Sequence, residues 1–198
     1  MHVEAFDKNI PVLVINDLYT KYELEQMSLE IDSLYEKSLL PTMTGAATTN
    51  KLLQKNTKGL FLDEYFNDNR DSSACLQLNR KVFFKENVNV FKKVSPAFSL
   101  ISTSNRDTTL ISWYDHNTYY KPHVDLSSIT ALTYFIKDDN FSGGTLVFND
   151  FDLKIKPYNG LTVLMVGSLL HSVTQVRNLK DKEIPLRVTM SQFLLHLG

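Results

Sequence analysis

The second half of the chain is a succession of short β-rich runs, and this pattern constrains the fold more than any other feature. Turn-forming residues separate the runs, at 142–144, 149–150 and 157–160. Short strands at such regular spacing are typical of an antiparallel sandwich or barrel. We therefore predict nine strands, at 98–103, 109–115, 119–125, 129–137, 144–148, 151–156, 161–166, 171–176 and 186–195.

The first half has a helical character. A β-branched run at 10–16 predicts one buried strand. Thr20 and Glu23 then have the spacing of a capping box, and apolar residues at three- and four-residue steps predict a helix over 21–36. We expect a polar loop at 38–58 and a second helix at 72–85. The fold class is thus α+β, mainly β, with helices packed outside a sandwich or barrel.

Length, charge and cysteine content exclude several classes of protein. The 198 residues suit a single domain, in which 1–97 would support a β core at 98–198. Lys and Arg total 21 against 22 Asp and Glu, so we expect no nucleic-acid or membrane partner. A single cysteine, Cys75, excludes an intramolecular disulfide and a cysteine zinc site. The longest apolar stretch, 161–170, is too short to span a bilayer, and we expect a cytoplasmic protein.

The segment 113–125 carries the residues most suited to chemistry. His123 and Asp125 are two positions apart, so an extended chain points both side chains to one face. His171 opens a later β-rich run and is the best candidate for a third ligand. Two histidines and one carboxylate form the facial ligand set of non-haem Fe(II) oxygenases, which leaves positions open for a cosubstrate and O2.

Arg187 stands in an otherwise apolar run, 186–195. A buried arginine requires an anionic partner, and its planar guanidinium matches a carboxylate through two parallel hydrogen bonds. Thr189, two residues further, would face the same way and donate a third hydrogen bond. A bound 2-oxoglutarate would supply the carboxylate. We interpret the competing Arg177 as facing solvent, because polar residues follow it.

In ordered combination these residues resemble the prolyl-4-hydroxylase-like branch of the Fe(II)/2-oxoglutarate-dependent dioxygenases. That family has Tyr, Gly, Tyr and His-x-Asp at three-residue steps, and this chain has Tyr114, Asn117, Tyr120, His123 and Asp125 there. Asn replaces the family's Gly, but Asn tolerates the left-handed conformation better than most residues. The resemblance is strongest over 109–195 and continues through further motifs, at 143–146, 160–168, 171–173 and 187–189.

The resemblance implies a double-stranded β-helix (jelly-roll) core with the N-terminal helices packed on one sheet. It implies that His123, Asp125 and His171 bind Fe(II), and that Arg187 and Thr189 bind the far carboxylate of 2-oxoglutarate. Tyr114 would assist that cosubstrate. O2 would be the oxidant, with ascorbate as an optional reductant. Because a carboxylate ligand is retained, the resemblance implies hydroxylation.

The sequence does not identify the substrate. The resemblance gives first a prolyl residue in a protein or peptide, and then a free amino acid or another small metabolite. A non-catalytic jelly-roll module, or a cupin-like protein with another metal, is the alternative from a different class. Arg187 argues against that alternative, because it would leave a buried charge unpaired. Tyr120 is either a core aromatic or a pocket residue.

Overall fold

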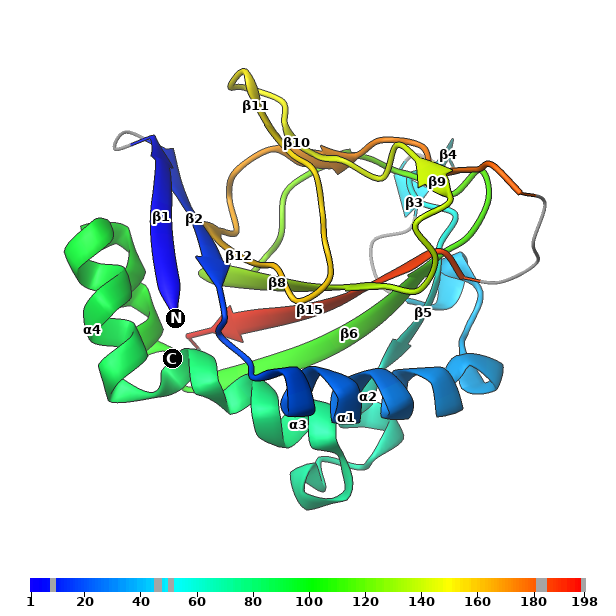
Figure 1. Ribbon diagram of the computed structural model, residues 1–198. Coiled ribbons are helices and arrows are strands. Elements are labelled where there is room, and N and C mark those ends of the chain that lie inside the picture. The colour runs from blue at the N-terminus through cyan, green and yellow to red at the C-terminus, as the bar shows by residue number, and fades with distance from the viewer. Residues whose placement is uncertain (8–9, 45–47, 50–51, 181–184, 197–198) are drawn as a thin grey trace.

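Two antiparallel sheets face each other in the computed structural model, which describes residues 1–7, 10–44, 48–49, 52–180 and 185–196 (Figure 1). The larger sheet has the strand order β1-β2-β12-β8-β15-β6-β5. Its strands are β1 (His2–Asp7), β2 (Ile10–Asn16), β12 (Thr162–Val166), β8 (Ile129–Ile136), β15 (Arg187–Leu195), β6 (Arg106–Tyr114) and β5 (Lys58–Phe61).

The smaller sheet has the order β11-β10-β13-β7. Its strands are β11 (Leu153–Ile155), β10 (Leu146–Phe148), β13 (His171–Val173) and β7 (Tyr120–His123). Two short pairs complete the strands that the structure describes: β9 (Phe141–Ser142) with β14 (Arg177–Asn178), and β3 (Thr48–Thr49) with β4 (Leu52–Leu53). Two opposed antiparallel sheets of this kind confirm the predicted jelly-roll core.

The helices cover the outer face of the larger sheet (Figure 1). They are α1 (Lys21–Ser33), α2 (Leu62–Tyr65), α3 (Ala74–Leu78) and α4 (Lys85–Val94). Short 3-10 turns join them, at Tyr35–Lys37, Pro41–Met43, Arg70–Ser72, Asn79–Phe83 and Pro96–Thr103. Within the described residues, no helix is long and apolar enough to cross a membrane.

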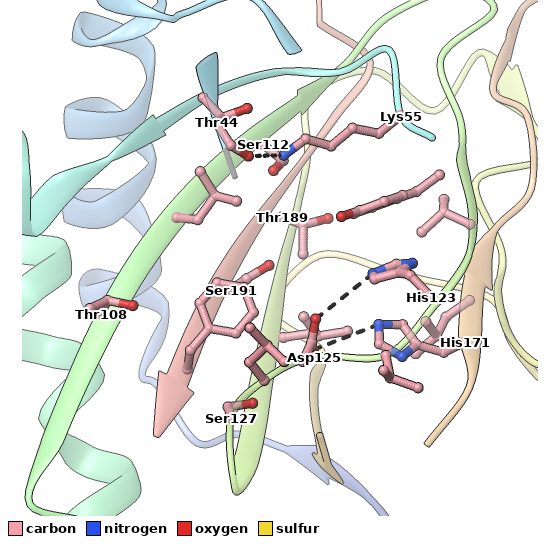
Figure 2. Close-up of a pocket in the computed structure, with 18 of the residues that line it drawn as sticks. Thr44, Lys55, Thr108, Ser112, His123, Asp125, Ser127, His171, Thr189 and Ser191 are labelled. Carbon is pink, nitrogen blue, oxygen red and sulfur yellow. Dashed lines mark hydrogen bonds and ion pairs between the residues drawn. The ribbon is translucent and has the colours of Figure 1, made fainter. Parts of the chain in front are cut away.

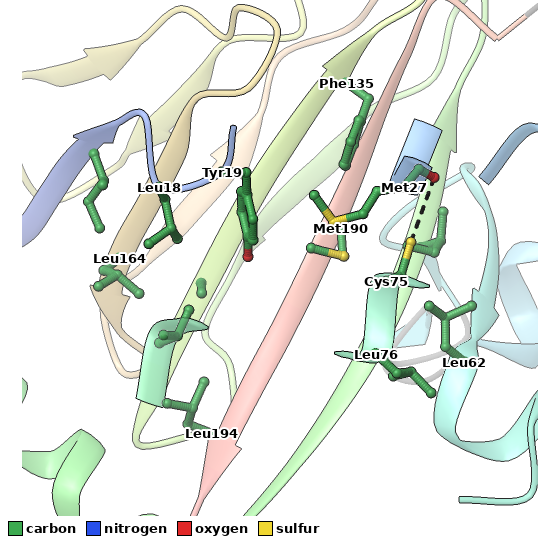
Figure 3. Packing of buried hydrophobic residues seen from close by; sticks show 14 of the residues in the cluster. Leu18, Tyr19, Met27, Leu62, Cys75, Leu76, Phe135, Leu164, Met190 and Leu194 are labelled. Carbon is green, nitrogen blue, oxygen red and sulfur yellow. Dashed lines mark hydrogen bonds between the residues drawn. The ribbon is translucent and has the colours of Figure 1, made fainter. Parts of the chain in front are cut away.

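Strand β15 separates the hydrophobic core from the cavity between the sheets. Successive side chains of a strand point to opposite faces. Val188, Met190 and Leu194 point to the helices and join the main core, which Figure 3 shows around Met190 and Cys75. Residues 187, 189, 191 and 193 therefore face the smaller sheet. This alternation lets one apolar strand carry both the core packing and an arginine.

The capping box at the start of α1 is present as predicted. The Thr20 hydroxyl accepts a hydrogen bond from the Glu23 backbone N–H, and the Glu23 carboxylate accepts one from the Thr20 backbone N–H. Met27 and Ile31, one turn apart, bury the inner face of the helix. The helix proper ends at Ser33, and a 3-10 turn follows it.

Three predictions of local structure are wrong. Residues 98–103 form a 3-10 helix that begins at Pro96 and buries Phe98 and Ile101, three positions apart, so their apolar period is that of a 3-10 turn. The helix predicted at 72–85 is α-helical only in α3 and continues as a 3-10 turn at Asn79–Phe83, and α4 begins where the predicted helix ends. The segment 38–58, predicted as loop, contains β3 and β4 and the start of β5, and 45–47 and 50–51 lie outside the described residues.

Candidate metal centre and cavity

The structure brings His123, Asp125 and His171 together on the inner face of the smaller sheet. Their candidate ligand atoms all lie within 4.8 Å of one another. The Nε2 atoms of His123 and His171 are 3.8 and 3.7 Å from the two Asp125 carboxylate oxygens (Figure 2). The two histidines face each other across the β7–β13 pair, so strand register alone fixes their approach.

Backbone carbonyls orient both imidazole rings. The Nδ1 of His123 lies 2.8 Å from the Lys121 carbonyl oxygen, and the Nδ1 of His171 lies 2.8 Å from the Leu169 carbonyl oxygen. Because a carbonyl oxygen only accepts, each Nδ1 must carry the hydrogen and donate it. With the hydrogen on Nδ1, Nε2 of each ring faces the space beside Asp125, which is the arrangement that a metal ion requires.

Hydrogen bonds to its backbone and to its carboxylate hold Asp125 in place. Its backbone N–H donates to the Gly167 carbonyl at 2.8 Å. The Thr130 hydroxyl donates to its carboxylate at 2.7 Å and is in turn 2.7 Å from the Ser127 hydroxyl. Hydrogen bonds of this kind hold a carboxylate ligand in one orientation.

Burial keeps the His123 imidazole ready for coordination. Desolvation, followed by the nearby His171, lowers the pKa of His123 to about 3. The ring is therefore neutral near pH 7, and no proton has to leave it before a metal ion binds.

The three residues lie in the wall of a cavity of about 330 Å³ between the sheets. This volume is at the lower end of the range of about 300–1,000 Å³ for small-molecule sites. Side chains of β6 and β15 form its floor, and apolar groups dominate it at the end away from Arg187. The floor residues are Thr108, Leu110, Ser112, Tyr114, Thr189, Ser191, Phe193 and Leu195.

Arg187 lies against two of these floor residues, Tyr114 and Thr189, and is completely buried. Its Nη1 donates to the Thr189 hydroxyl at 2.9 Å, and its guanidinium carbon is 3.9 Å from the centre of the Tyr114 ring. Within the described part of the chain, its Nε and Nη2 have no hydrogen-bond partner. A buried guanidinium with two free nitrogen atoms could bind a carboxylate.

Gly144 makes room for this guanidinium. It has a φ of +67°, and a Cβ added there would lie 2.8 Å from Nε of Arg187. A side chain at this position would therefore be strained and would also press on the arginine.

Asn117 and Tyr120 complete the motif that precedes His123. Asn117 adopts the left-handed conformation, with φ of 64°, as its place in the turn predicted. Tyr120 lines the cavity, and its ring stacks on that of His123 with centroids 3.5 Å apart. The alternative left open for Tyr120 is therefore resolved in favour of a pocket residue.

Among the cavity residues that the sequence analysis did not single out are Tyr134 and Lys55. Tyr134 is buried beside Thr189 in the β8–β15 register, and its ring centre is 5.4 Å from the Arg187 guanidinium carbon. The alternation of side chains along β8 would have allowed Tyr134 to be assigned to the cavity face of the strand. Lys55 is 2% exposed, although its segment appeared as a polar loop, and only the tertiary structure shows its place. Burial lowers the pKa of Lys55 to about 8, against the opposing effect of Asp125.

Comparison with known proteins gives structural neighbours and no sequence matches. No protein-family model and no curated protein matches the chain. A prolyl hydroxylase from Trichoplax adhaerens, solved with a hypoxia inducible factor peptide fragment, has a TM-score of 0.64 at 13% identity, covering 95% of this chain and 84% of that chain. A Pseudomonas putida prolyl-4-hydroxylase has a TM-score of 0.60 at 11% identity, covering 96% and 95%.

A third neighbour has a different activity. The non-haem alpha ketoglutarate dependent epimerase SnoN from nogalamycin biosynthesis has a TM-score of 0.54 at 9% identity, covering 94% of this chain and 77% of that chain. The chain therefore shares the fold of the 2-oxoglutarate-Fe(II) oxygenases over almost its whole length. Neighbours at this low identity include both hydroxylases and an epimerase. The fold therefore does not identify the reaction, which has to be argued from the site.

Proposed function

We propose that the protein is an Fe(II)- and 2-oxoglutarate-dependent dioxygenase that hydroxylates a C–H bond. One observation carries the proposal. A buried guanidinium with two unpartnered nitrogen atoms, Arg187, contacts Tyr114 and Thr189, which line the same cavity whose wall holds His123, Asp125 and His171. A metal site and an anchor for a carboxylate in one small cavity are what this chemistry requires.

The donor set fits the metal. Two imidazole nitrogens and one carboxylate oxygen suit Fe(II) and leave three coordination positions open. When bound there, Fe(II) and 2-oxoglutarate supply the oxidising power for reaction of O2 with a C–H bond. The protein's own part is to hold the three ligand atoms in place and to keep the cavity dry.

The cosubstrate site fits a dicarboxylate. The free nitrogen atoms of Arg187 would donate to its far carboxylate, and the Thr189 hydroxyl, which accepts from Nη1, has its own hydrogen left to donate. Tyr114 stacks on the guanidinium and fixes its plane. The Gly144 backbone lies close against the arginine side chain.

A proline, as a residue of a peptide or as the free amino acid, is the first substrate to test. Two of the structural neighbours described above are prolyl hydroxylases, and one of them was solved with a peptide. The apolar part of the cavity floor, with Leu110, Phe193 and Leu195, would accept a small aliphatic ring.

A metal-binding module that uses no 2-oxoglutarate is the competing function. In such a protein the charge of Arg187 would stay buried without an anionic partner, which is strongly unfavourable. The arginine therefore favours the dioxygenase.

An anaerobic titration tests the proposal. We expect purified protein with Fe(II) and 2-oxoglutarate to develop the weak visible charge-transfer band of a chelated 2-oxo acid. Arg187→Gln should need about 100-fold more 2-oxoglutarate, because a buried charged pair is lost. Arg177→Gln removes an exposed arginine and should titrate like the wild type. Intact metal binding without a band in the wild type would favour the metal-binding module instead.

A further inference from the structure

Lys55 is a second buried cation in the cavity, and the roles proposed so far do not use it. It is 2% exposed and belongs to the cavity wall. Among the described residues that line the cavity itself, Lys55 is the only lysine or arginine and Asp125 the only carboxylate, while Arg187 lies behind the lining residues Tyr114 and Thr189. A buried ammonium is costly unless an opposite charge or several hydrogen bonds compensate it.

The backbone fixes Lys55 beside the metal-binding strand. Lys55 forms an isolated antiparallel bridge with Tyr120. The Lys121 N–H donates to the Gln54 carbonyl at 2.8 Å, and the Asn56 N–H donates to the Tyr119 carbonyl at 3.4 Å. This short stretch therefore extends the smaller sheet past β7 and directs the lysine into the cavity.

The ammonium is only partly satisfied by the protein. It donates to the Thr44 carbonyl, and this is its only hydrogen bond within the described part of the chain. It lies 5.5 Å from the centre of the Tyr120 ring, which stacks on His123. Figure 2 shows it near Ser112 and Thr44, on the Thr189 side of the metal site. An ammonium has three donors, so two are left for a ligand in the cavity.

A count of charges identifies the kind of ligand. Arg187 and Lys55 each bring one positive charge, a divalent ion brings two, and Asp125 brings one negative charge. When a dianionic 2-oxoglutarate is added, the sum of these charges is still one positive charge. Because Arg187 lies next to the cosubstrate pocket, the uncompensated charge is that of Lys55. The cavity then balances only if the substrate itself carries a negative charge.

We infer that Lys55 binds a carboxylate of the substrate and so selects a free amino or other small carboxylic acid, or a C-terminal residue, over an internal residue of a peptide. This inference rests on the proposed function, since it assumes that 2-oxoglutarate occupies the Arg187 end. The small cavity volume agrees with it. The apolar lining residues Phe61 and Leu110, which pair in the β5–β6 register, would hold the hydrocarbon part of the acid.

The test uses benzoate and benzamide as a matched pair of probes. They have nearly the same shape and apolar surface, and only benzoate is charged. Binding of each is measured by calorimetry on protein loaded with Mn(II) and saturated with 2-oxoglutarate, so that the Arg187 end is filled. We expect benzoate to bind at least about tenfold more tightly than benzamide, as a charged hydrogen bond would give.

Two variants and a control assign the preference. Lys55→Met should reduce the ratio of the two affinities to about one, and Lys55→Arg should retain it, because only the cation is required. Lys58→Met is the control: Lys58 is exposed on β5, bonds to Tyr35, and is not part of the cavity wall. It should leave the ratio unchanged.

The outcomes separate the inference from the function that it rests on. Equal affinities for the two probes in the wild type would overturn the inference, and so would a preference for benzoate that survives in Lys55→Met. In either case normal binding of 2-oxoglutarate would leave the proposed function standing. Failure of 2-oxoglutarate itself to bind the Mn(II)-loaded wild type would overturn the proposed function, and the inference with it.

Discussion

His123 and His171 lie directly opposite each other in the β7–β13 pair, with ring centroids 4.2 Å apart. Each ring donates its Nδ1–H to a carbonyl oxygen two residues earlier in the chain. The same local arrangement is therefore used on both strands, and it directs both Nε2 atoms toward Asp125. This arrangement leads to the first prediction.

Loss of one histidine should abolish tight metal binding. We expect His171→Ala to weaken Mn(II) binding by more than about 100-fold, because it removes a metal ligand and not only a residue that orients a ligand. In the wild type, metal at about 100 times its Kd should raise the free energy of unfolding by about 2.7 kcal/mol, and EDTA should reverse this. His196→Ala changes an exposed histidine and should behave like the wild type. Unchanged Mn(II) affinity in His171→Ala would refute the ligand set.

Thr130 should act through Asp125. We expect Thr130→Val to weaken metal binding by about 10-fold to 100-fold, because the carboxylate loses the hydroxyl that orients it. Thr133→Val is the matched control, since Thr133 lies on the same strand and its hydroxyl contacts Thr162. Both variants can be compared by Mn(II) titration with thermal melting as a check of folding. Equal effects on metal affinity would show that the hydrogen bond to Asp125 is not responsible.

Gly144 should control the cosubstrate pocket. We expect Gly144→Ala to weaken 2-oxoglutarate binding by about tenfold or more, because the new methyl group would displace the Arg187 side chain. Gly160→Ala introduces comparable strain, with φ of +81° and a contact of 2.7 Å to Leu24, but it lies away from the cavity wall. It should lower stability and leave 2-oxoglutarate affinity intact. Parallel calorimetry and melting curves distinguish the two effects.

Glu23 should make stability depend on pH in the acid range. Burial raises the pKa of this carboxyl, but hydrogen bonds from Lys81 and Thr20 outweigh that effect and lower it below the usual 4.5. Its contribution to stability is therefore present above about pH 4.5 and is lost as the pH falls through the folded-state pKa. We expect Glu23→Gln to cost about 0.5–1 kcal/mol at pH 7, since Gln keeps the capping hydrogen bond and loses the ion pair.

Urea unfolding at pH 7 and at pH 3 measures this difference. At pH 3 the difference between Glu23→Gln and the wild type should shrink. The exposed Glu25 lies on the same helix, and Glu25→Gln should show no comparable change between the two pH values. A constant cost across the range would mean that the ion pair contributes nothing to the stability.

The sequence was informative where local rules govern the outcome. The capping box of Thr20 and Glu23, the left-handed Asn117 and the strand over 186–195 all depend on residues close together in the chain, and all are present. The 3-10 helix at Pro96–Thr103 shows the limit of this reasoning. Its apolar residues satisfied a strand pattern, but packing of Phe98 and Ile101 on the core selected a period of three.

The sequence by itself also determined which residues stand as candidates for the metal site and for the carboxylate anchor. What only the tertiary structure decided is their arrangement, because the register of β7 with β13 and of β15 with β8 joins residues up to 65 positions apart. Lys55 shows this most clearly. Nothing near it in the chain predicts burial, and its place in the cavity comes from pairing with Tyr120, 65 residues away. Long-range strand pairing, which no local propensity encodes, thus defines the charge of the cavity.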